Sequence, residues 1–261
     1  MANYNFSDLK DKVVVVVGGF GFIGKALCDG FAHNGVRLII ADIYKDAQYL
    51  KKLIKLNKNK IEYVNFDMTK EKEVPVFIKN IVKKYKNIDV LVNCSWPRTK
   101  DWATKIEKVP YRSIKENLVN HLGGYYNVTQ QVAMQMVKQN SGSIINFSSI
   151  YGTVAPTFSI YEGTKMTSPS AYALIKGGIN SMTKYFASYF GKDNIRVNCI
   201  SPGGVLNKED AKFVAKYNKL TPLGRMAKPE DLVMPVLFLS SDGSKYITGH
   251  NLLVDGGWTI H

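Results

Sequence analysis

Residues 13–24 of the chain read VVVVVGGFGFIG, and this stretch decides the fold. Five consecutive valines predict a strand over residues 12–18 that is buried on both faces, as in a parallel sheet. The glycines that follow permit a tight turn and a close approach of the backbone to a pyrophosphate, whose charge the N-terminus of the next helix stabilises. Because the loop joins the first strand to the first helix, it predicts a dinucleotide site rather than a merely structural turn. The expected cofactor contacts in this loop are Gly18, Gly21, Phe22, Ile23 and Gly24.

An acidic residue, Asp42, ends the second expected strand, eighteen residues beyond Gly24. A carboxylate at this point can accept hydrogen bonds from the ribose hydroxyls of an adenosine, and it would repel a 2′-phosphate. The glycine loop contains no Arg or Lys that could pair with such a phosphate. The sequence therefore predicts NAD(H) rather than NADP(H) as the cofactor. The alternative is that Asp42 only caps a helix beginning near Tyr44.

Outside the glycine loop, strand-like apolar runs alternate with helix-length segments along the chain. This alternation predicts a doubly wound Rossmann-type α/β fold, with a seven-stranded parallel sheet and helices on both faces. The other expected strands are 37–42, 61–66, 88–93, 143–148, 196–200 and 251–254. The expected helices are 22–35, 44–56, 70–85, 111–139, 169–191 and 229–240. No repeat or Pro/Gly-rich linker divides the chain, so we expect a single domain over residues 1–261.

Two longer loops, residues 94–109 and 150–168, each follow an expected strand. Both should therefore lie at the carboxyl edge of the sheet, where ligands bind in open α/β folds. We expect these loops to line the substrate pocket, with Arg98 or Lys165 holding an anionic group and Tyr161 contributing to the pocket. Arg suits bidentate recognition of phosphate or carboxylate, although Arg98 could equally be a plain surface charge.

Composition excludes several classes of protein. The 261 residues are 45% apolar and 21% charged, as in ordinary globular proteins. Three distant cysteines without metal-ligand spacing predict no metal site and a reducing compartment. Because no stretch approaches the ~20 apolar residues of a membrane span, and the first residues lack the apolar core of a signal peptide, we expect a cytoplasmic protein without a membrane partner.

The formal net charge of +14 raises the question of a nucleic-acid partner. Its densest lysine run, residues 51–60, alternates with Leu and Ile at helical spacing, which favours a solvated helix face. No recognised nucleic-acid-binding motif accompanies it, so we expect none. A positive field would instead attract an anionic small-molecule substrate.

Three further segments are similar to one protein family. They are GSIINFSSIYG (142–152), YALIKGGINSMTKYFASYFGKDNIRVNCISPGG (172–204) and PLGRMAKPEDL (222–232). They resemble the compact branch of the short-chain dehydrogenases/reductases, and the likeness covers nearly the whole chain. The resemblance implies four catalytic residues, namely Asn120, Ser149, Tyr172 and Lys176. It also implies cofactor contacts from Asp67, Met68, Asn93, Tyr172, Lys176, Pro202 and Val205, and a homo-oligomer, either dimer or tetramer.

The fourth strand departs from the family pattern. That strand usually ends in Asn-Asn-Ala-Gly, but here it reads Asn93-Cys94-Ser95-Trp96, so that only the first residue matches. The loops around Trp96 and within residues 150–168 resemble those of a bacterial subgroup of flagellin-modification or surface-glycan oxidoreductases. This likeness implies a sugar phosphate or nucleotide sugar as the substrate.

Two Tyr-x-x-x-Lys pairs compete for the catalytic role. Tyr161 and Lys165 flank Gly163 and precede Pro169, which indicates a loop. Tyr172 and Lys176 follow Ser168, a good N-cap, and Pro169, a good first helical residue, so they should share one helix face. A neighbouring ammonium favours the phenolate, and Tyr172 is therefore expected to exchange the substrate's hydroxyl proton during hydride transfer. The alternatives are a non-catalytic NAD-binding regulator, or an epimerase or dehydratase that recycles its NAD internally.

Overall fold

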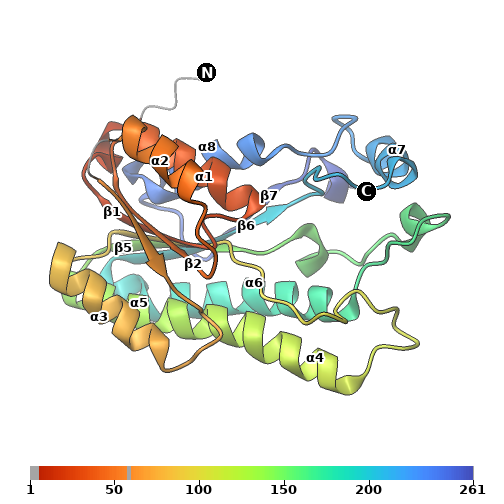
Figure 1. Ribbon diagram of the computed structural model, residues 1–261, viewed down its shortest axis with the longest axis horizontal. Coiled ribbons are helices and arrows are strands. Elements are labelled where there is room, and N and C mark those ends of the chain that lie inside the picture. Colours follow the sequence, from red (N-terminus) through yellow and green to blue (C-terminus); the bar gives the residue numbers. More distant parts are fainter. Residues whose placement is uncertain (1–5, 58–59, 261) are drawn as a thin grey trace.

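The computed structural model describes residues 6–57 and 60–260, so that Lys58 and Asn59 of the lysine run lie outside the described part. Seven parallel strands form one sheet in the order β3-β2-β1-β4-β5-β6-β7 (Figure 1). The strand order reverses between β1 and β4, which creates the crevice where doubly wound sheets bind ligands. The predicted fold is thus confirmed. The strands are β1 (Val13–Val17), β2 (Arg37–Asp42), β3 (Ile61–Asn65), β4 (Val90–Asn93), β5 (Gly142–Phe147), β6 (Ile195–Pro202) and β7 (Asn251–Val254).

The valine run of β1 supplies both layers of the core. Successive side chains of a strand point to opposite faces of the sheet. Val13, Val15 and Val17 therefore enter one hydrophobic cluster, whereas Val14 and Val16 enter the other. All five are buried, which accounts for the absence of polar residues from this strand.

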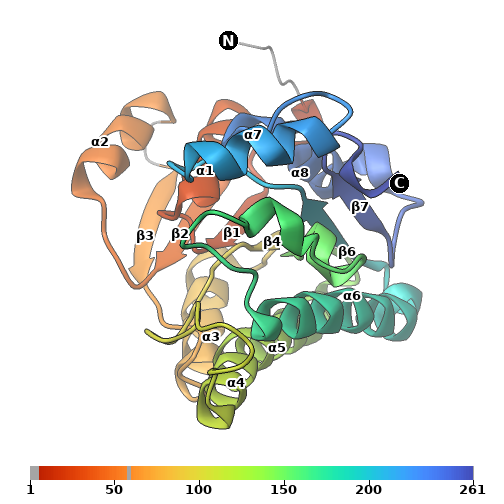
Figure 2. The same ribbon diagram turned by 90° about the vertical axis from the view of Figure 1, so that its right-hand side faces the viewer.

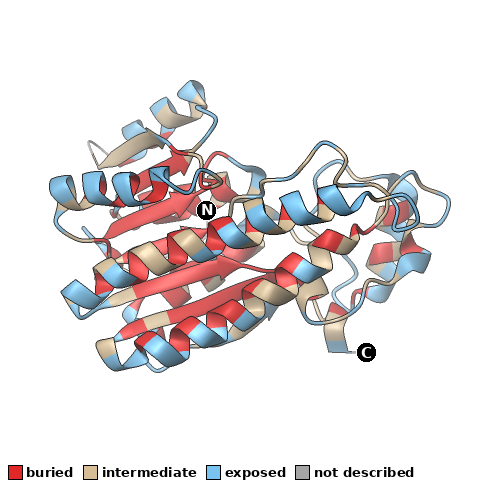
Figure 3. Ribbon diagram, turned by 90° about the horizontal axis from the view of Figure 1, so that it is seen from below, coloured by how far each residue is buried: buried red, intermediate tan, exposed pale blue. Residues whose placement is uncertain are grey.

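Helices cover both faces of the sheet, as Figure 2 shows from the carboxyl edge. One layer consists of α1 (Phe22–His33), α2 (Ala47–Leu56) and α8 (Val233–Ser240). The other consists of α3 (Glu73–Tyr85), α4 (Tyr111–Asn117), α5 (Gly124–Gln139) and α6 (Ser170–Phe190). Figure 3 shows the buried sheet beneath helices whose outer faces are exposed. Within the described residues, no helix is long and apolar enough to cross a bilayer.

Several helix boundaries differ from those predicted. Helix α2 begins at Ala47 rather than Tyr44, because the side chain of Asp46 accepts a hydrogen bond from the Tyr49 amide and caps the helix there. Helix α6 begins at Ser170, and its N-terminus has no side-chain cap; the predicted cap, Ser168, has a buried hydroxyl without a hydrogen-bond partner among the described residues.

The predicted helix 111–139 is divided in the structure. A π-helical turn, Leu118–Gly123, separates α4 from α5. Such turns widen the helix by one residue, and they are frequent at functional sites. The predicted helix 229–240 similarly begins with a 3₁₀ turn, Pro229–Leu232, before α8.

An additional helix, α7 (Ala211–Leu220), was not predicted. It packs against the 150–168 loop, and together we call these two segments the cap. A third hydrophobic cluster joins them, and it includes Ile160 from the loop and Phe213 from α7. The Lys216 ammonium donates to the carbonyl oxygens of Ser159 and Glu162, each at 2.9 Å, which ties the helix to the loop. Figure 2 shows the cap at the edge where the strands end.

Candidate active site

The glycine loop after β1 is in direct main-chain contact with its neighbours. Gly18 has a φ of 83°, and a Cβ added to it would lie 2.5 Å from the Cα of Ser95, which follows β4. A Cβ on Gly24 would overlap the carbonyl oxygen of Gly18 and lie 2.8 Å from the Cα of Gly19. The glycines are thus required by steric contact, and the loops after β1 and β4 meet at the crevice.

The N-terminus of α1 is available to an anion. Gly21 occupies the N-cap position, no side chain caps the helix, and its first turn has no acidic residue. The first amides of a helix have no intrahelical acceptor, and the helix dipole favours negative charge there. Phe22 is 45% exposed and Ile23 is half-buried beside these amides.

Asp42 connects the glycine loop to the turn after β2. Its carboxylate accepts hydrogen bonds from the amides of Phe20, at 2.9 Å, and Tyr44, at 3.0 Å. The capping of α2 belongs to Asp46, so the alternative role considered for Asp42 is not the one the structure gives it. A carboxylate has about four lone-pair sites, and two are left after these bonds to accept from ribose hydroxyls.

The predicted adenine contacts follow β3. One carboxylate oxygen of Asp67 accepts from the Thr69 amide, at 3.0 Å, and from its hydroxyl, at 2.7 Å. Met68 is buried, and its sulfur accepts a hydrogen bond from the Ser95 hydroxyl. Both residues therefore help to shape the crevice from the β3 side.

Asn93, also expected at the cofactor, is directed into the protein. Its fully buried amide donates to Asn146 Oδ1, at 2.9 Å, and to Thr129 Oγ1, at 3.1 Å. The main-chain carbonyl oxygen of Asn93 accepts a hydrogen bond from the Tyr125 hydroxyl at 2.9 Å. The side chain thus links β4 to β5 and α5, and it presents no exposed surface to the crevice.

Tyr172 and Lys176 lie one turn apart on α6, beside the end of β5. The Lys176 ammonium is buried, lies 5.5 Å from the centre of the Tyr172 ring, and donates to the Phe147 carbonyl at 2.8 Å. Ser149 follows β5, and its hydroxyl accepts from the Tyr151 amide at 3.2 Å. By contrast, Tyr161 and Lys165 lie on the cap, in a 3₁₀ turn and an exposed loop.

Burial dominates the electrostatics of the pair. It lowers the pKa of Lys176 to about 7, because the charged ammonium loses water that a single carbonyl bond does not replace. Burial also raises the pKa of Tyr172, although a hydrogen bond from the Ser149 side chain acts in the opposite direction. Desolvation is therefore the largest influence on the pKa of both groups within the protein itself.

The comparisons with known proteins agree with this geometry. Residues 21–259 match the family model described as Enoyl-(Acyl carrier protein) reductase. A solved short chain dehydrogenase from Leptospira borgpetersenii with bound NAD+ has 35% identity and a TM-score of 0.87, covering 99% of this chain and 97% of its own. This chain belongs to the short-chain dehydrogenase/reductase family. It is accordingly an oxidoreductase that uses a nicotinamide dinucleotide.

Other members of the short-chain dehydrogenase/reductase family widen the range of functions. Post-translational flagellin modification protein A from Campylobacter coli is 39% identical over 97% of this chain and 100% of that protein. A solved structure of ElxO with NADP bound has 25% identity and a TM-score of 0.82, covering 96% of this chain and 100% of its own. Family membership therefore leaves the choice between NAD and NADP to the residues of the crevice.

The π turn holds the residue that the family resemblance implies as the catalytic asparagine, Asn120, which is half-buried. Its neighbour His121 is fully buried, and neither ring nitrogen has a hydrogen-bond partner among the described residues. Burial, and secondarily the charge of Lys176, lowers the pKa of His121, so the imidazole is neutral at pH 7. His121 was not predicted from the sequence, although a histidine inside LVNHLGG was a visible signal.

Aromatic side chains surround Tyr172 on its outer side. Trp96 and Trp102, from the loop after β4, have ring centres 6.1 and 5.6 Å from that of Tyr172. Tyr151, from the cap, lies at 6.5 Å, and its hydroxyl is 3.2 Å from that of Tyr161. Both loops were expected at this edge from the sequence, but neither tryptophan was predicted as a site residue.

The two residues expected at the nicotinamide follow or end β6. Pro202 is the last residue of β6 and is buried, and Val205 forms a bridge with Ala227. Between them, the amide of Gly204 donates to the hydroxyl of Tyr217 on α7 at 2.6 Å. The loop that would meet the nicotinamide is therefore tied to the cap.

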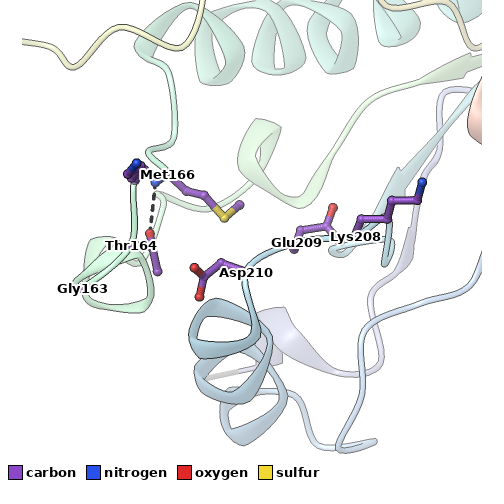
Figure 4. Close-up of a pocket in the computed structure, with 7 residues that line it drawn as sticks. Gly163, Thr164, Met166, Lys208, Glu209 and Asp210 are labelled. Atoms are coloured by element: carbon purple, nitrogen blue, oxygen red, sulfur yellow. Dashed lines mark hydrogen bonds between the residues drawn. The ribbon is translucent and has the colours of Figure 1, made fainter.

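A cleft of about 610 Å³ opens at the cap. Residues 163–166 line one side and residues 208–210 line the other, with the Met166 side chain directed across it (Figure 4). Asp210 caps α7 by accepting from the Lys212 amide at 2.8 Å. Lys165 and Lys208 carry positive charge at this cleft, and Glu209 and Asp210 balance it with negative charge. Across residues 6–57 and 60–260, no cluster of His, Cys, Asp or Glu could hold a metal ion.

Proposed function

We propose that this protein is an NAD(H)-dependent dehydrogenase/reductase of the cytoplasm, formed by one domain over residues 1–261. It transfers hydride between nicotinamide C4 and a secondary alcohol or ketone of an anionic sugar, either a sugar phosphate or a nucleotide sugar, in the biosynthesis of a flagellin or surface glycan. The observation that carries the proposal is the Tyr172–Lys176 pair beside Ser149, at the crevice that the glycine loop opens. The likeness to a flagellin modification protein supports the pathway.

Residues along the whole crevice support the binding of a dinucleotide. The α1 N-terminus with Gly18, Gly21, Phe22, Ile23 and Gly24 would hold the pyrophosphate, and Asp42 would hold the adenosine ribose. Asp67 and Met68 would border the adenine, Lys176 the second ribose, and Pro202 and Val205 the nicotinamide. The negative charge of Asp42 opposes a 2′-phosphate, which supports NAD over NADP. When bound, the nicotinamide supplies the hydride acceptor or donor.

The protein's own part in the reaction is acid–base catalysis. Tyr172 takes the substrate's hydroxyl proton during oxidation and returns it during reduction. Ser149 donates a hydrogen bond to the substrate oxygen, and Asn120 helps to relay protons through water. Lowering the tyrosine pKa by about three units requires roughly 4 kcal/mol of differential stabilisation. Lys176 and the positive charge of oxidised nicotinamide would supply this stabilisation together.

The substrate side supports an anion. The Arg98 guanidinium lies 4.3 Å from the centre of the Trp96 ring, and Arg98 takes part in no salt bridge among the described residues. A stacked arginine keeps its donors in a fixed plane that suits bidentate phosphate binding. Tyr161 is half-buried with its hydroxyl toward Tyr151, where it would contact the sugar.

We also propose a homo-oligomer, dimer or tetramer, without a nucleic-acid partner. Apolar side chains remain exposed on the outer face of α5 and α6, including Tyr126, Leu174 and Tyr185. A shallow apolar hollow adjoins them, lined in part by Leu122 and Met182. Analytical ultracentrifugation tests this assembly, and a stable monomer would contradict it.

The deciding experiment follows NADH absorbance with NAD⁺ and a panel of sugar phosphates, nucleotide sugars and simple alcohols. Tyr172→Phe should lower kcat by about 10²–10⁴-fold, because it removes the proton-transferring group, and it should change NADH affinity far less, because the other cofactor contacts remain. The matched control is Tyr161→Phe, the other Tyr-x-x-x-Lys tyrosine, which should act mainly on KM. A Tyr172→Phe protein that keeps most of its turnover would refute the assignment. Product formation that depends on Tyr172 without net NADH would indicate internal recycling.

A further inference from the structure

The side chains of Trp96, Trp102 and Tyr151 form a surface around Tyr172 that we call the aromatic wall. Trp96 and Trp102 meet edge to face, with ring centres 5.0 Å apart and an interplanar angle of 87°. Trp102 and Tyr151 are also nearly perpendicular to the Tyr172 ring, at 83° and 87°. Two separate loops therefore converge on the same tyrosine, with Trp102 and Tyr151 edge-on to its ring and Trp96 tilted at 56°.

The wall is held in place although it lies on a long irregular loop. The Asn117 amide on α4 donates to Thr99 Oγ1 at 2.8 Å, and its oxygen accepts from the Thr99 amide at 3.1 Å. The Ser113 hydroxyl donates to Asp101 at 2.8 Å. Ser113 and Asn117 are both buried. These bonds lie between Trp96 and Trp102 in the sequence, so the loop that carries both indoles is anchored to α4, and an anchored loop lowers the entropic cost of binding.

The exposure of Trp96 indicates that a ligand covers it. This indole is 47% exposed, whereas the chain's third tryptophan, Trp258, is buried and stacks on Tyr217 at 4.1 Å. Trp96 also stands where the family pattern has a glycine, so the large side chain is a feature of this chain rather than of the fold. An exposed aromatic surface beside a catalytic group is the mark of a binding site.

The polar groups around the wall define the chemistry of that ligand. Arg98 lies against Trp96, the Tyr151 and Tyr161 hydroxyls lie at the cap side, and Ser149 lies next to Tyr172. A flexible acyl chain would cover these groups without pairing them, and burying an unpaired polar group is unfavourable. A saturated sugar ring has an apolar C–H face for the indoles and hydroxyl groups at its edge for the polar side chains.

We propose that the aromatic wall binds the ring of a pyranose, stacking its C–H face on Trp96 or Trp102, and that it selects cyclic sugars against acyl thioesters. This proposal rests on the proposed function, because it places the ring's reacting carbinol at Tyr172. It adds the residues that determine specificity and the part of the substrate they recognise. Arg98 then lies at the rim of the ring site, where a phosphate attached to the sugar would reach it.

The test separates binding from turnover by using Tyr172→Phe protein loaded with NADH. Tryptophan fluorescence is titrated with glucose 6-phosphate, UDP-glucose and, as the acyl probe, acetoacetyl-CoA. At least one cyclic sugar should quench the fluorescence at lower concentration than the acyl probe. Adding Trp96→Leu should weaken that binding about tenfold, which corresponds to a stacking contribution near 1.4 kcal/mol, and Trp96→Phe should restore most of it.

Two controls make the outcomes distinct. The NADH dissociation constant should stay unchanged in all Trp96 variants, which shows that the fold and crevice are intact. In active protein, Trp96→Leu should raise KM with little change in kcat. The proposed role of the aromatic wall is overturned if no sugar binds, or if the Trp96→Leu protein binds the sugar with the same affinity as the protein without that substitution. If the protein then turned over a non-sugar in a Tyr172-dependent reaction, the proposed dehydrogenase activity would still hold. If no Tyr172-dependent turnover occurred with any substrate, the proposed function itself would be refuted.

Discussion

The glycine loop and the cap are both irregular segments at the carboxyl edge of the sheet, but they are built in opposite ways. In the glycine loop, main chain touches main chain, and a Cβ on Gly18 would lie 2.5 Å from the backbone of Ser95. In the cap, side chains from distant segments form a cluster of their own, and Gly163 has no atom within 4 Å of its would-be Cβ. The cofactor side is therefore shaped by backbone sterics, and the substrate side by side-chain contacts.

The most direct test of this difference adds one methyl group to a glycine in each region. Gly24→Ala should destabilise the fold by at least about 3 kcal/mol, because its Cβ can be accommodated only by displacing the backbone of Gly18 and Gly19. Cofactor binding should be lost with it. Urea unfolding and an NADH titration measure the two effects.

Gly163→Ala is the matched variant in the cap. Its φ of 77° strains a residue with a Cβ, but the added methyl group meets nothing, so the cost should be about 1–2 kcal/mol. NADH affinity should not change. Comparable losses of folding stability in the two variants, or loss of cofactor binding in Gly163→Ala, would contradict the difference between the two regions.

A pH-dependent effect concerns Lys176, which lies between the two regions. Burial lowers its pKa to about 7 in the folded protein, against an ordinary value near 10.4 in the unfolded chain. Between these values the unfolded state binds more protons, so the free energy of unfolding should rise with pH, by up to about 1.4 kcal/mol per unit. Below pH 7 both states are protonated, and the cost of burying the charge is present in full.

Lys176→Met removes this titration. Urea unfolding at pH 7, 8 and 9 should show the wild type gaining stability relative to the variant as the pH rises. If the free energy of unfolding changed with pH equally in the two proteins, the Lys176 ammonium would be better solvated than its burial indicates. Water would then reach the site between the glycine loop and the cap.

The smallest effect is expected at Asp42. Asp42→Ala should weaken NAD⁺ binding by about tenfold and lower stability by about 1 kcal/mol, because two backbone amides lose their acceptor. Asp42→Asn keeps one acceptor oxygen and removes the charge, so it should lose less stability while gaining tolerance for NADP⁺. Isothermal titration with both cofactors checks this, and an unchanged preference in Asp42→Asn would show that charge does not set it.

The predictability of each region from sequence follows from the same contrast. The valine run, the glycine loop and Asp42 are local signals, so the sheet and the cofactor loop could be predicted from short stretches. Helix α7 was missed because its apolar residues, such as Phe213 and Tyr217, pack within the third hydrophobic cluster rather than on the sheet. The N-cap of α7, Asp210, was the available signal.

Two other differences arose where local and tertiary preferences compete. Ser168 is a good N-cap by type, but the chain enters α6 from a buried turn, and the helix begins after Pro169. The positions of Trp96 and Trp102 depend on how Asn117 and Ser113 hold their loop, and these contacts join residues far apart in sequence. No spacing rule reveals such bonds before the fold is known.

The contact between Gly18 and Ser95 has a consequence for how such an enzyme diverges. The two turns that border the crevice must change together, since neither can enlarge without displacing the other. The cap has a core of its own, so mutations away from Tyr217, which binds the Gly204 amide, can accumulate there with little effect on the crevice. Lineages derived from this chain should therefore keep their coenzyme while exchanging one substrate for another, with new specificities arising first in the cap.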